Sequence, residues 1–363
     1  MATNETIHAD LAIPPGEYLE EVLGELGMSK DDLARRMGRP AAKLSPIFKG
    51  DKAITPETAL QLEKVVGVPA HIWAGLESEY RLALARQAEA ECDTLLHAEA
   101  KLAARFCYSA LVKAGEVERR TKPVEKAQAL RDYFGVMSLN SVPELQRYRA
   151  AFRCGRSGER SREAVAAWLR LGERRAQGAY CAPFDETRLR EALDFLRALT
   201  LEASDHFQAS LRTRLAACGV ALVICPHFPK TRAHGATFWL GRDKAVLMLT
   251  IRGKWADIFW FSLFHEIGHI LLHGRQAVIL EGGTEDRRET EADRFAADTL
   301  IPEDAYRSFL EHGRFYSQDV VAFANSVGVH PGVVVGRLQH EKRLKPEWGN
   351  DLRVRYRWAE TED

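Results

Sequence analysis

The sequence predicts a mainly α-helical protein with a small β-sheet, an α+β chain of more than one domain. Three observations lead to this fold class. Apolar residues recur at helical spacing between glycine stops near the N-terminus, a charged and mostly helical middle follows, and short apolar runs typical of strands appear only after residue 215. At 363 residues, with 46% apolar and 28% charged residues, the chain is expected to form two or three domains with buried cores.

Cysteine usage and hydropathy indicate the cellular compartment. The six cysteines are scattered and include no CxxC pair, which indicates reduced thiols rather than disulfides or a thiolate zinc site. No apolar run reaches the roughly 18 residues of a membrane span, and the N-terminal stretch MATNETIHADLAIPP has no basic, apolar leader. We therefore expect a cytoplasmic protein without a membrane partner.

Residues 15–77 are expected to form a compact set of short helices. Ser29 and Thr55 are predicted N-caps, and Pro56 stands at the first helical position after Thr55. Glycines are placed to end several of these helices. A helix, a tight turn with glycine and a second helix form the arrangement that places a helix in the major groove of DNA.

The stretches SKDDLARRMG and LSPIFKGDKAITPETALQLEKVVGVPAHIWAGLESEY resemble the antitoxin-type helix-turn-helix repressors of the HigA group. The resemblance covers about residues 12–82 and implies an XRE-type DNA-binding domain there. DNA is therefore an expected partner. A cognate toxin and a second copy of the chain, forming a homodimer, are further expected partners.

The candidate DNA contacts of this segment are cations that can bind phosphates. Phosphate contacts position a protein on DNA without specifying sequence. The start of the expected recognition helix carries Pro40, Ala41 and Ala42, where a base reader would carry Arg, Asn or Gln. The alternative is a helix-turn-helix module kept for dimerisation or sensing. The candidate phosphate-binding residues are Arg35, Arg36, Arg39, Lys43, Lys49 and Lys52.

The stretch FHEIGHILLHG carries the clearest chemical signal of the chain. His265 and His269 lie four residues apart in an apolar-rich helix, so both imidazoles project from one face and can reach one zinc ion. Glu266 lies beside them, where a carboxylate can take a proton from zinc-bound water and pass it to a leaving amine. His273 is too far along the helix to share the ion and is expected at its rim or behind a ligand.

The third zinc ligand is expected on the next helix, RRETEADRFAADTLIP, where Glu289 and Glu291 compete. Glu289 is preferred because it shares a helical face with Ala292 and Ala296, whose small side chains permit close packing against the zinc helix. Asp293, one turn beyond Glu289, is expected to hydrogen-bond a ligating histidine.

The segments GATFWL, FWFSLFHEIGHILLHG and ETEADRFAADTLIP together resemble the ImmA/IrrE family of zinc peptidases. Members combine the HExxH helix with a later ExxA[ND]xFA helix, and the resemblance covers about residues 195–302. It implies a gluzincin-like metallopeptidase domain that cleaves helix-turn-helix repressors. We thus expect a helix-turn-helix domain (12–82), a helical middle region (83–194) and a peptidase domain with a C-terminal helical extension (195–363).

The predicted function is that of a zinc-dependent metallo-endopeptidase and transcriptional regulator. It would cleave a helix-turn-helix repressor or antitoxin-type protein and so relieve repression in stress, toxin–antitoxin or phage-related regulation. His234, just before a predicted strand, is a candidate oxyanion donor or else a loop histidine without a catalytic role. The alternative function is a non-catalytic DNA-binding antitoxin or repressor whose zinc site is structural.

Overall fold

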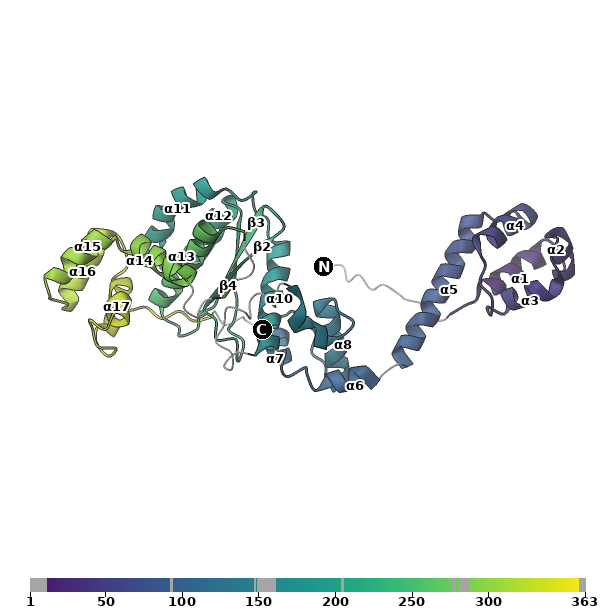
Figure 1. Cartoon of the computed structure of the whole chain (residues 1–363), viewed down its shortest axis with the longest axis horizontal. Coiled ribbons are helices and arrows are strands. Elements are labelled where there is room, and N and C mark those ends of the chain that lie inside the picture. Colours follow the sequence, from purple (N-terminus) through teal and green to yellow (C-terminus); the bar gives the residue numbers. More distant parts are fainter. Residues whose placement is uncertain are drawn as a thin grey trace. The chain divides into compact units, whose positions relative to one another are not determined.

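The chain forms two compact units, Met1–Leu95 and Leu96–Asp363, in the computed structural model (Figure 1). As predicted, the fold is mostly helical with a small sheet, which lies in the C-terminal unit. The structure describes residues 12–91, 94–146, 148, 161–203, 206–275, 279–280 and 287–358.

The N-terminal unit is a set of helices whose starts are encoded locally. The Ser29 hydroxyl accepts a hydrogen bond from the amide of Asp32, and the Thr55 hydroxyl accepts one from the amide of Thr58. Both predicted N-caps are therefore confirmed. The helices are α1 (Pro15–Glu25), α2 (Lys30–Arg36), α3 (Ala41–Phe48), α4 (Pro56–Val66) and α5 (Ala70–Glu91).

The core of the N-terminal unit is built from the apolar faces of α1 to α5. Helix α1 crosses the end of α3 at Gly16, where a Cβ would overlap the backbone of Phe48, so the close approach requires glycine. Trp73 of α5 is fully buried in the same core. The buried members are Leu19, Val22, Leu23, Leu33, Ala34, Met37, Leu44, Ile47, Phe48, Ile54, Ala59, Leu62, Val66 and Trp73.

The C-terminal unit is organised around a four-stranded sheet with the order β1-β3-β2-β4. Strand β1 (Val220–Ile224) runs parallel to β3 (Lys244–Leu249), whereas β2 (Gly235–Leu240) is antiparallel to β3 and to β4 (Ile279–Leu280). The first three strands coincide with the apolar runs GVALVIC, GATFWL and AVLMLT, which the sequence predicts to be strands. The two-residue strand β4 was not predicted.

Helices cover both faces of this sheet. Because side chains alternate along a strand, Leu222 and Leu247 face one layer of helices while Val223 and Val246 face the other. The first layer contains α13 (Ala256–His273), and the second contains α10 (Arg162–Gly178), on opposite sides of the strands in Figure 1.

The first layer contains the helices that follow the sheet in sequence, together with two that precede it. Around α13 lie α11 (Glu186–Ala198), α12 (Phe207–Ala217), α14 (Arg287–Leu300), α15 (Glu303–Glu311), α16 (Ser317–Val327) and α17 (Pro331–His340). Short 3₁₀ segments complete the unit at Leu139–Glu144, Leu199–Leu201 and Asn350–Leu352.

The second layer comes from the predicted middle region, and its helices share a core with the sheet. Gly172 of α10 lies on Met248 of β3 so closely that a Cβ would overlap the sulfur, which lets the helix pack flat on the strand. Residues of α6 (Thr94–Ala100), α7 (Tyr108–Lys113) and α8 (Pro123–Phe134) pack in the same core.

The first turn of α13 is held by a buried ion pair. The Arg353 guanidinium donates from Nε to Asp257 Oδ1 at 3.0 Å and from Nη2 to Oδ2 at 2.7 Å. Both side chains are less than a tenth exposed, so each charge depends on the other. This bidentate contact joins the C-terminal segment to the start of the helix that carries the HExxH motif.

In the described part of the chain, no single helix is long and apolar enough to cross a membrane. Helices α16 and α17, bent by 112° relative to each other, reach that length and apolar composition only as a pair. In the structure their apolar residues, including Val320, Ala324 and Val334, are buried in the core of the C-terminal unit.

Candidate metal centre

Helix α13 carries the predicted motif in the interior of the C-terminal unit. His265, Glu266 and His269 are 1%, 0% and 1% exposed. The helix is apolar on nearly its whole circumference because it lies between the sheet and the helices of the first layer. Three ionisable groups at such depth are costly unless they are compensated.

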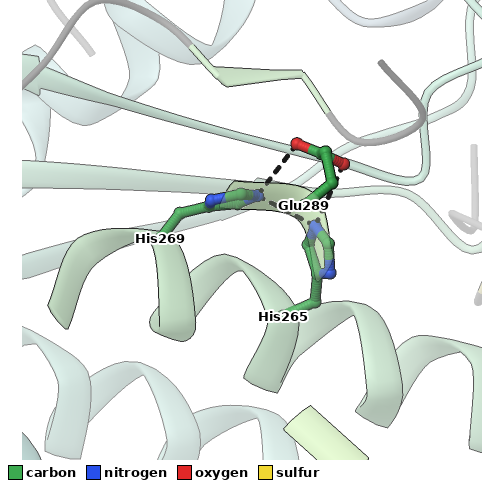
Figure 2. A group of neighbouring side chains, drawn as sticks. All are labelled: His265, His269 and Glu289. Carbon is green, nitrogen blue, oxygen red and sulfur yellow. Dashed lines mark hydrogen bonds and ion pairs between the residues drawn. The ribbon is translucent and has the colours of Figure 1, made fainter. Parts of the chain in front are cut away.

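Glu289 approaches the two histidines from the first turn of α14 (Figure 2). The Nε2 atoms of His265 and His269 lie 2.9 Å apart. Glu289 Oε2 is 3.7 Å from His265 Nε2, and Glu289 Oε1 is 3.3 Å from His269 Nε2. His265, His269 and Glu289, which we call the donor group, each offer one donor atom within 4.8 Å of the others. One metal ion can therefore contact all three. Two imidazoles and one carboxylate form a ligand set that fits zinc with a position left for water.

Close contact between α13 and α14 brings Glu289 to this point. Gly268 faces α14, and a Cβ there would lie 3.3 Å from the Ala292 Cα atom and 3.0 Å from the Phe295 ring. Ala292 and Ala296 are both fully buried. The small residues that the sequence places beside Glu289 therefore lie at the helix crossing, as expected.

Asp293 contacts His265 on the side away from the other donors. The Nδ1 atom of His265 lies 2.8 Å from Asp293 Oδ1. A carboxylate only accepts hydrogen bonds, so His265 donates from Nδ1–H and keeps its Nε2 lone pair for a metal. The expected contact between Asp293 and a candidate ligand histidine is present in the structure.

Glu291, the alternative to Glu289, lies against His273. Its Oε2 atom is 3.1 Å from His273 Nε2, and its Oε1 atom accepts from Arg287 Nε at 2.7 Å. These hydrogen bonds, first from Arg287 and then from His273, hold the pKa of Glu291 below its usual value. Among the described residues, the donor group contains Glu289 and not Glu291.

Burial also affects the protonation of the candidate ligands. Desolvation lowers the pKa of His269, with the hydrogen bond to Glu289 acting in the opposite direction. The neutral imidazole is the form that binds a metal. The site therefore favours the ligand form of His269 at neutral pH.

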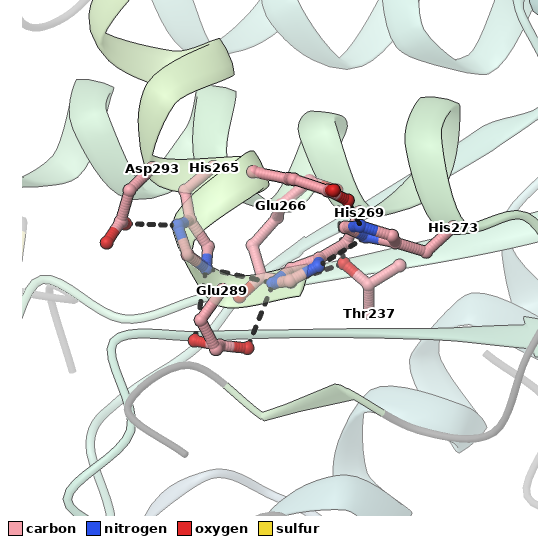
Figure 3. Close-up of polar contacts among 8 residues, drawn as sticks. Thr237, His265, Glu266, His269, His273, Glu289 and Asp293 are labelled. Carbon is pink, nitrogen blue, oxygen red and sulfur yellow. Dashed lines mark hydrogen bonds and ion pairs between the residues drawn. The ribbon is translucent and has the colours of Figure 1, made fainter. Parts of the chain in front are cut away.

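Glu266 lies beside the donor group, and its side chain contacts strand β2. Its carboxylate accepts a hydrogen bond from the Thr237 hydroxyl of β2 (Figure 3). The start of the strand packs directly on it, because a Cβ at Gly235 would overlap Glu266 Oε1. Sequence reasoning missed Thr237. The available signal was a single polar side chain in the apolar run GATFWL.

His234 lies immediately before β2 and is partly buried. Its backbone carbonyl accepts from the Thr250 amide at 2.8 Å. The residue lines a cavity of about 760 Å³ that Asp293 of α14 and Phe261 of α13 also line. His234 thus shares a cavity with Asp293, which contacts His265, and its role as an oxyanion donor stays a prediction.

The candidate DNA contacts lie around α2 and α3 of the N-terminal unit. Arg39 donates from Nη1 to the Thr58 hydroxyl at 2.9 Å and so ties the start of α3 to α4. Ala41 and Ala42 at the exposed start of α3 carry only methyl groups, which cannot form a hydrogen bond with a DNA base. The five other cations are exposed, namely Arg35, Arg36, Lys43, Lys49 and Lys52.

Comparison with known proteins gives matches for both units. The model of the family described as the IrrE N-terminal-like domain, Peptidase_M78, matches residues 247–339. The N-terminal region is similar to the "Uncharacterized HTH-type transcriptional regulator YddM" of Escherichia coli (strain K12), at 34% identity over 73 residues, 20% of this chain and 78% of that protein. "Virulence-associated protein I" of Dichelobacter nodosus is 35% identical over 77 residues, 21% of this chain and 71% of its own.

Two solved structures also match, each over less than a quarter of this chain. An addiction module antidote protein of a HigA family from Coxiella burnetii has 34% identity and a TM-score of 0.22, covering 23% of this chain and 90% of its own. A putative antidote protein of a plasmid maintenance system from Nostoc punctiforme has 26% identity and a TM-score of 0.21, covering 22% of this chain and 87% of its own.

Proposed function

We propose that this chain is a zinc-dependent metallo-endopeptidase and transcriptional regulator. Through its N-terminal region it belongs to the helix-turn-helix regulators. It also carries an IrrE N-terminal-like domain of the peptidase M78 family. The observation that carries the proposal is the convergence of His265, His269 and Glu289 on one point. Glu266 is buried beside them without being part of the donor group.

The donor group would hold the ion through the two Nε2 atoms and the Glu289 carboxylate. Zinc, when bound, supplies polarisation of the peptide carbonyl and acidifies a water molecule. Glu266 would serve as the general base that takes a proton from the attacking water and returns it to the amide nitrogen of the leaving group. The Thr237 hydroxyl, through its hydrogen bond, keeps the Glu266 carboxylate in place on α13.

The substrate that we propose is a helix-turn-helix repressor or antitoxin-type protein, whose cleavage relieves repression. The N-terminal unit would hold DNA through phosphate contacts of its exposed cations, with Arg35 and Lys43 on either side of the turn between α2 and α3. A cognate toxin, a second copy of the chain and a cytoplasmic location belong to the same proposal.

A second candidate function is a non-catalytic DNA-binding antitoxin or repressor with a structural zinc ion. It is favoured by the similarity to a helix-turn-helix regulator that spans 78% of that protein's length. The two functions differ in what they require of Glu266. A structural ion needs its ligands, whereas peptide hydrolysis also needs the base.

Substitution of Glu266 by Gln separates the two functions. The amide keeps the size of the side chain but does not accept a proton at neutral pH, so the rate should fall by roughly 10² to 10⁴ while zinc content stays unchanged. The measurement is cleavage of a helix-turn-helix repressor encoded beside this chain, incubated with the purified zinc-loaded protein. Zinc content is determined on the same samples.

The matched control is Glu186→Gln, an exposed glutamate of α11 that pairs only with Arg190 of its own helix among the contacts described for it. The control should cleave at the wild-type rate. If Glu266→Gln and the wild-type protein cleave the repressor equally, Glu266 is not the base. If neither protein cleaves it while zinc-ligand variants alter DNA binding or the cellular response, the ion is structural.

A further inference from the structure

Three histidines follow one another along a single face of α13 at spacings of four residues. His273 is the third, and its side chain is only 5% exposed. It does not join the donor group, because its Nε2 atom lies 3.1 Å from Glu291 Oε2 on α14. Its Nδ1 atom lies 3.1 Å from the Nδ1 atom of His269. The face of His269 opposite to Glu289 is therefore occupied by another imidazole.

The direction of each hydrogen bond in this row follows from one carboxylate. Glu291 only accepts, so His273 donates to it from Nε2–H. A neutral imidazole with its proton on Nε2 has a lone pair on Nδ1, which can accept from His269 Nδ1–H. His269 then has its lone pair on Nε2, the atom that lies 3.3 Å from Glu289 Oε1. Each tautomer is compatible with the next.

Helix α14 thus carries the hydrogen-bond acceptors that orient both candidate ligand histidines. Asp293 accepts directly from His265 Nδ1, whereas Glu291 acts on His269 through the ring of His273. Arg287 donates to the other oxygen of Glu291 at 2.7 Å, which favours the carboxylate form at the end of the row. Glu289, Glu291 and Asp293 therefore have three separate tasks within five residues of α14.

We propose that His273 and Glu291 are positioning residues for the metal: together they hold His269 in the Nδ1–H tautomer, with the Nε2 lone pair directed at the ion. This inference rests on the zinc site of the proposed function but does not require peptidase activity. Partners of this kind on a ligand histidine typically change metal affinity by about 10- to 100-fold when they are removed.

The experiment measures zinc affinity of the full-length protein by competition with a chromophoric chelator, without any substrate. His273→Phe keeps the ring volume and removes both nitrogens, so zinc should bind about tenfold more weakly or worse. His273→Asn retains an acceptor near the Nδ1 position and should recover most of the affinity. His273→Gln places its amide near the Nε2 position instead and should recover little.

Glu291→Gln keeps an acceptor for His273 but removes the negative charge, so its loss of affinity should be smaller than that of His273→Phe. The matched control is Asp298→Asn on the same helix. Asp298 is as exposed as Glu291, at 38% against 41% of the side chain, and pairs with Arg294 rather than with a histidine. It should bind zinc as the wild type does.

Two further readouts separate positioning from packing. The d–d absorption bands of the Co²⁺-loaded protein should change in His273→Phe and remain in Asp298→Asn, because only the first alters a ligand's hydrogen bond. Thermal unfolding of the metal-free proteins reports any loss of packing. Wild-type zinc affinity in His273→Phe would overturn the inference. The inference would also be overturned if His273→Asn and His273→Gln lost zinc affinity equally and if these losses paralleled a fall in melting temperature.

Zinc binding also distinguishes this inference from the proposed function. A protein that binds zinc, responds to the His273 variants as described and cleaves no repressor would retain the positioning role and lose the peptidase proposal. A protein that cleaves a repressor but is indifferent to His273 would do the opposite.

Discussion

The N-terminal unit and the metal centre carry their candidate functional residues in opposite ways. In the N-terminal unit the candidate cations are on the surface; Arg35 is 77% exposed and pairs with Asp32 of its own helix at 3.3 Å. In the metal centre, His265 and His269 are almost fully buried, and their polar contacts lie on a second helix, α14.

Because of this difference, we expect gradual effects from substitutions in the first region and abrupt effects from substitutions in the second. Exposed charges act through solvent with weak, additive and salt-dependent effects. Buried donors act as a set, because removing one leaves the others desolvated and unmatched. We therefore expect all-or-none changes at the candidate metal centre and gradual changes at the candidate DNA contacts around α2 and α3.

The largest effect is expected from substitution of a zinc ligand. The wild-type protein should contain about one zinc per chain, and His265→Ala or His269→Ala should lose nearly all of it, since two donors cannot retain the ion. Metal analysis after gel filtration measures this. Glu289→Ala should lose more zinc than Glu291→Ala; the reverse order would make Glu291 the third ligand.

An intermediate effect is expected from a cavity in the core of the N-terminal unit. Leu62 of α4 is 1% exposed, and Leu62→Ala should destabilise this unit by about 2–5 kcal/mol. The cores of the two units share no residue among those described, so the zinc-dependent transition of the C-terminal unit should not move. Thermal unfolding with and without zinc tests this. A parallel shift of both transitions would show that the units are coupled.

The smallest effect is expected at the candidate DNA contacts. Arg35→Ala combined with Lys43→Ala should weaken binding about equally on all DNA sequences and reduce the salt dependence by roughly one counterion per lost phosphate contact. Binding to several duplexes across a range of salt concentrations measures this. Unchanged binding would place the DNA contacts elsewhere, and a loss on one sequence only would indicate base reading.

Much of the fold was accessible from the sequence because its signals are local. The N-caps at Ser29 and Thr55, the strands that begin at Val220, Gly235 and Lys244, and the helix that bears His265 all follow from a few neighbouring residues. Strand β4 was not accessible because two residues carry no periodicity. Its pairing with β2 through Ala236 and Thr237 depends on the rest of the sheet.

The local sequence sufficed to predict the residue types of the candidate metal centre: two histidines four residues apart with a candidate base beside them, and acidic residues on the next helix. Which acidic residue lies at which histidine depends on the tertiary structure, because it is set by how α13 and α14 cross at Gly268 and Ala292. The crossing places Glu289 on both Nε2 atoms and Glu291 on His273. Helical spacing sets the direction of a side chain, whereas contact between two helices requires their distance and angle, which no local pattern contains.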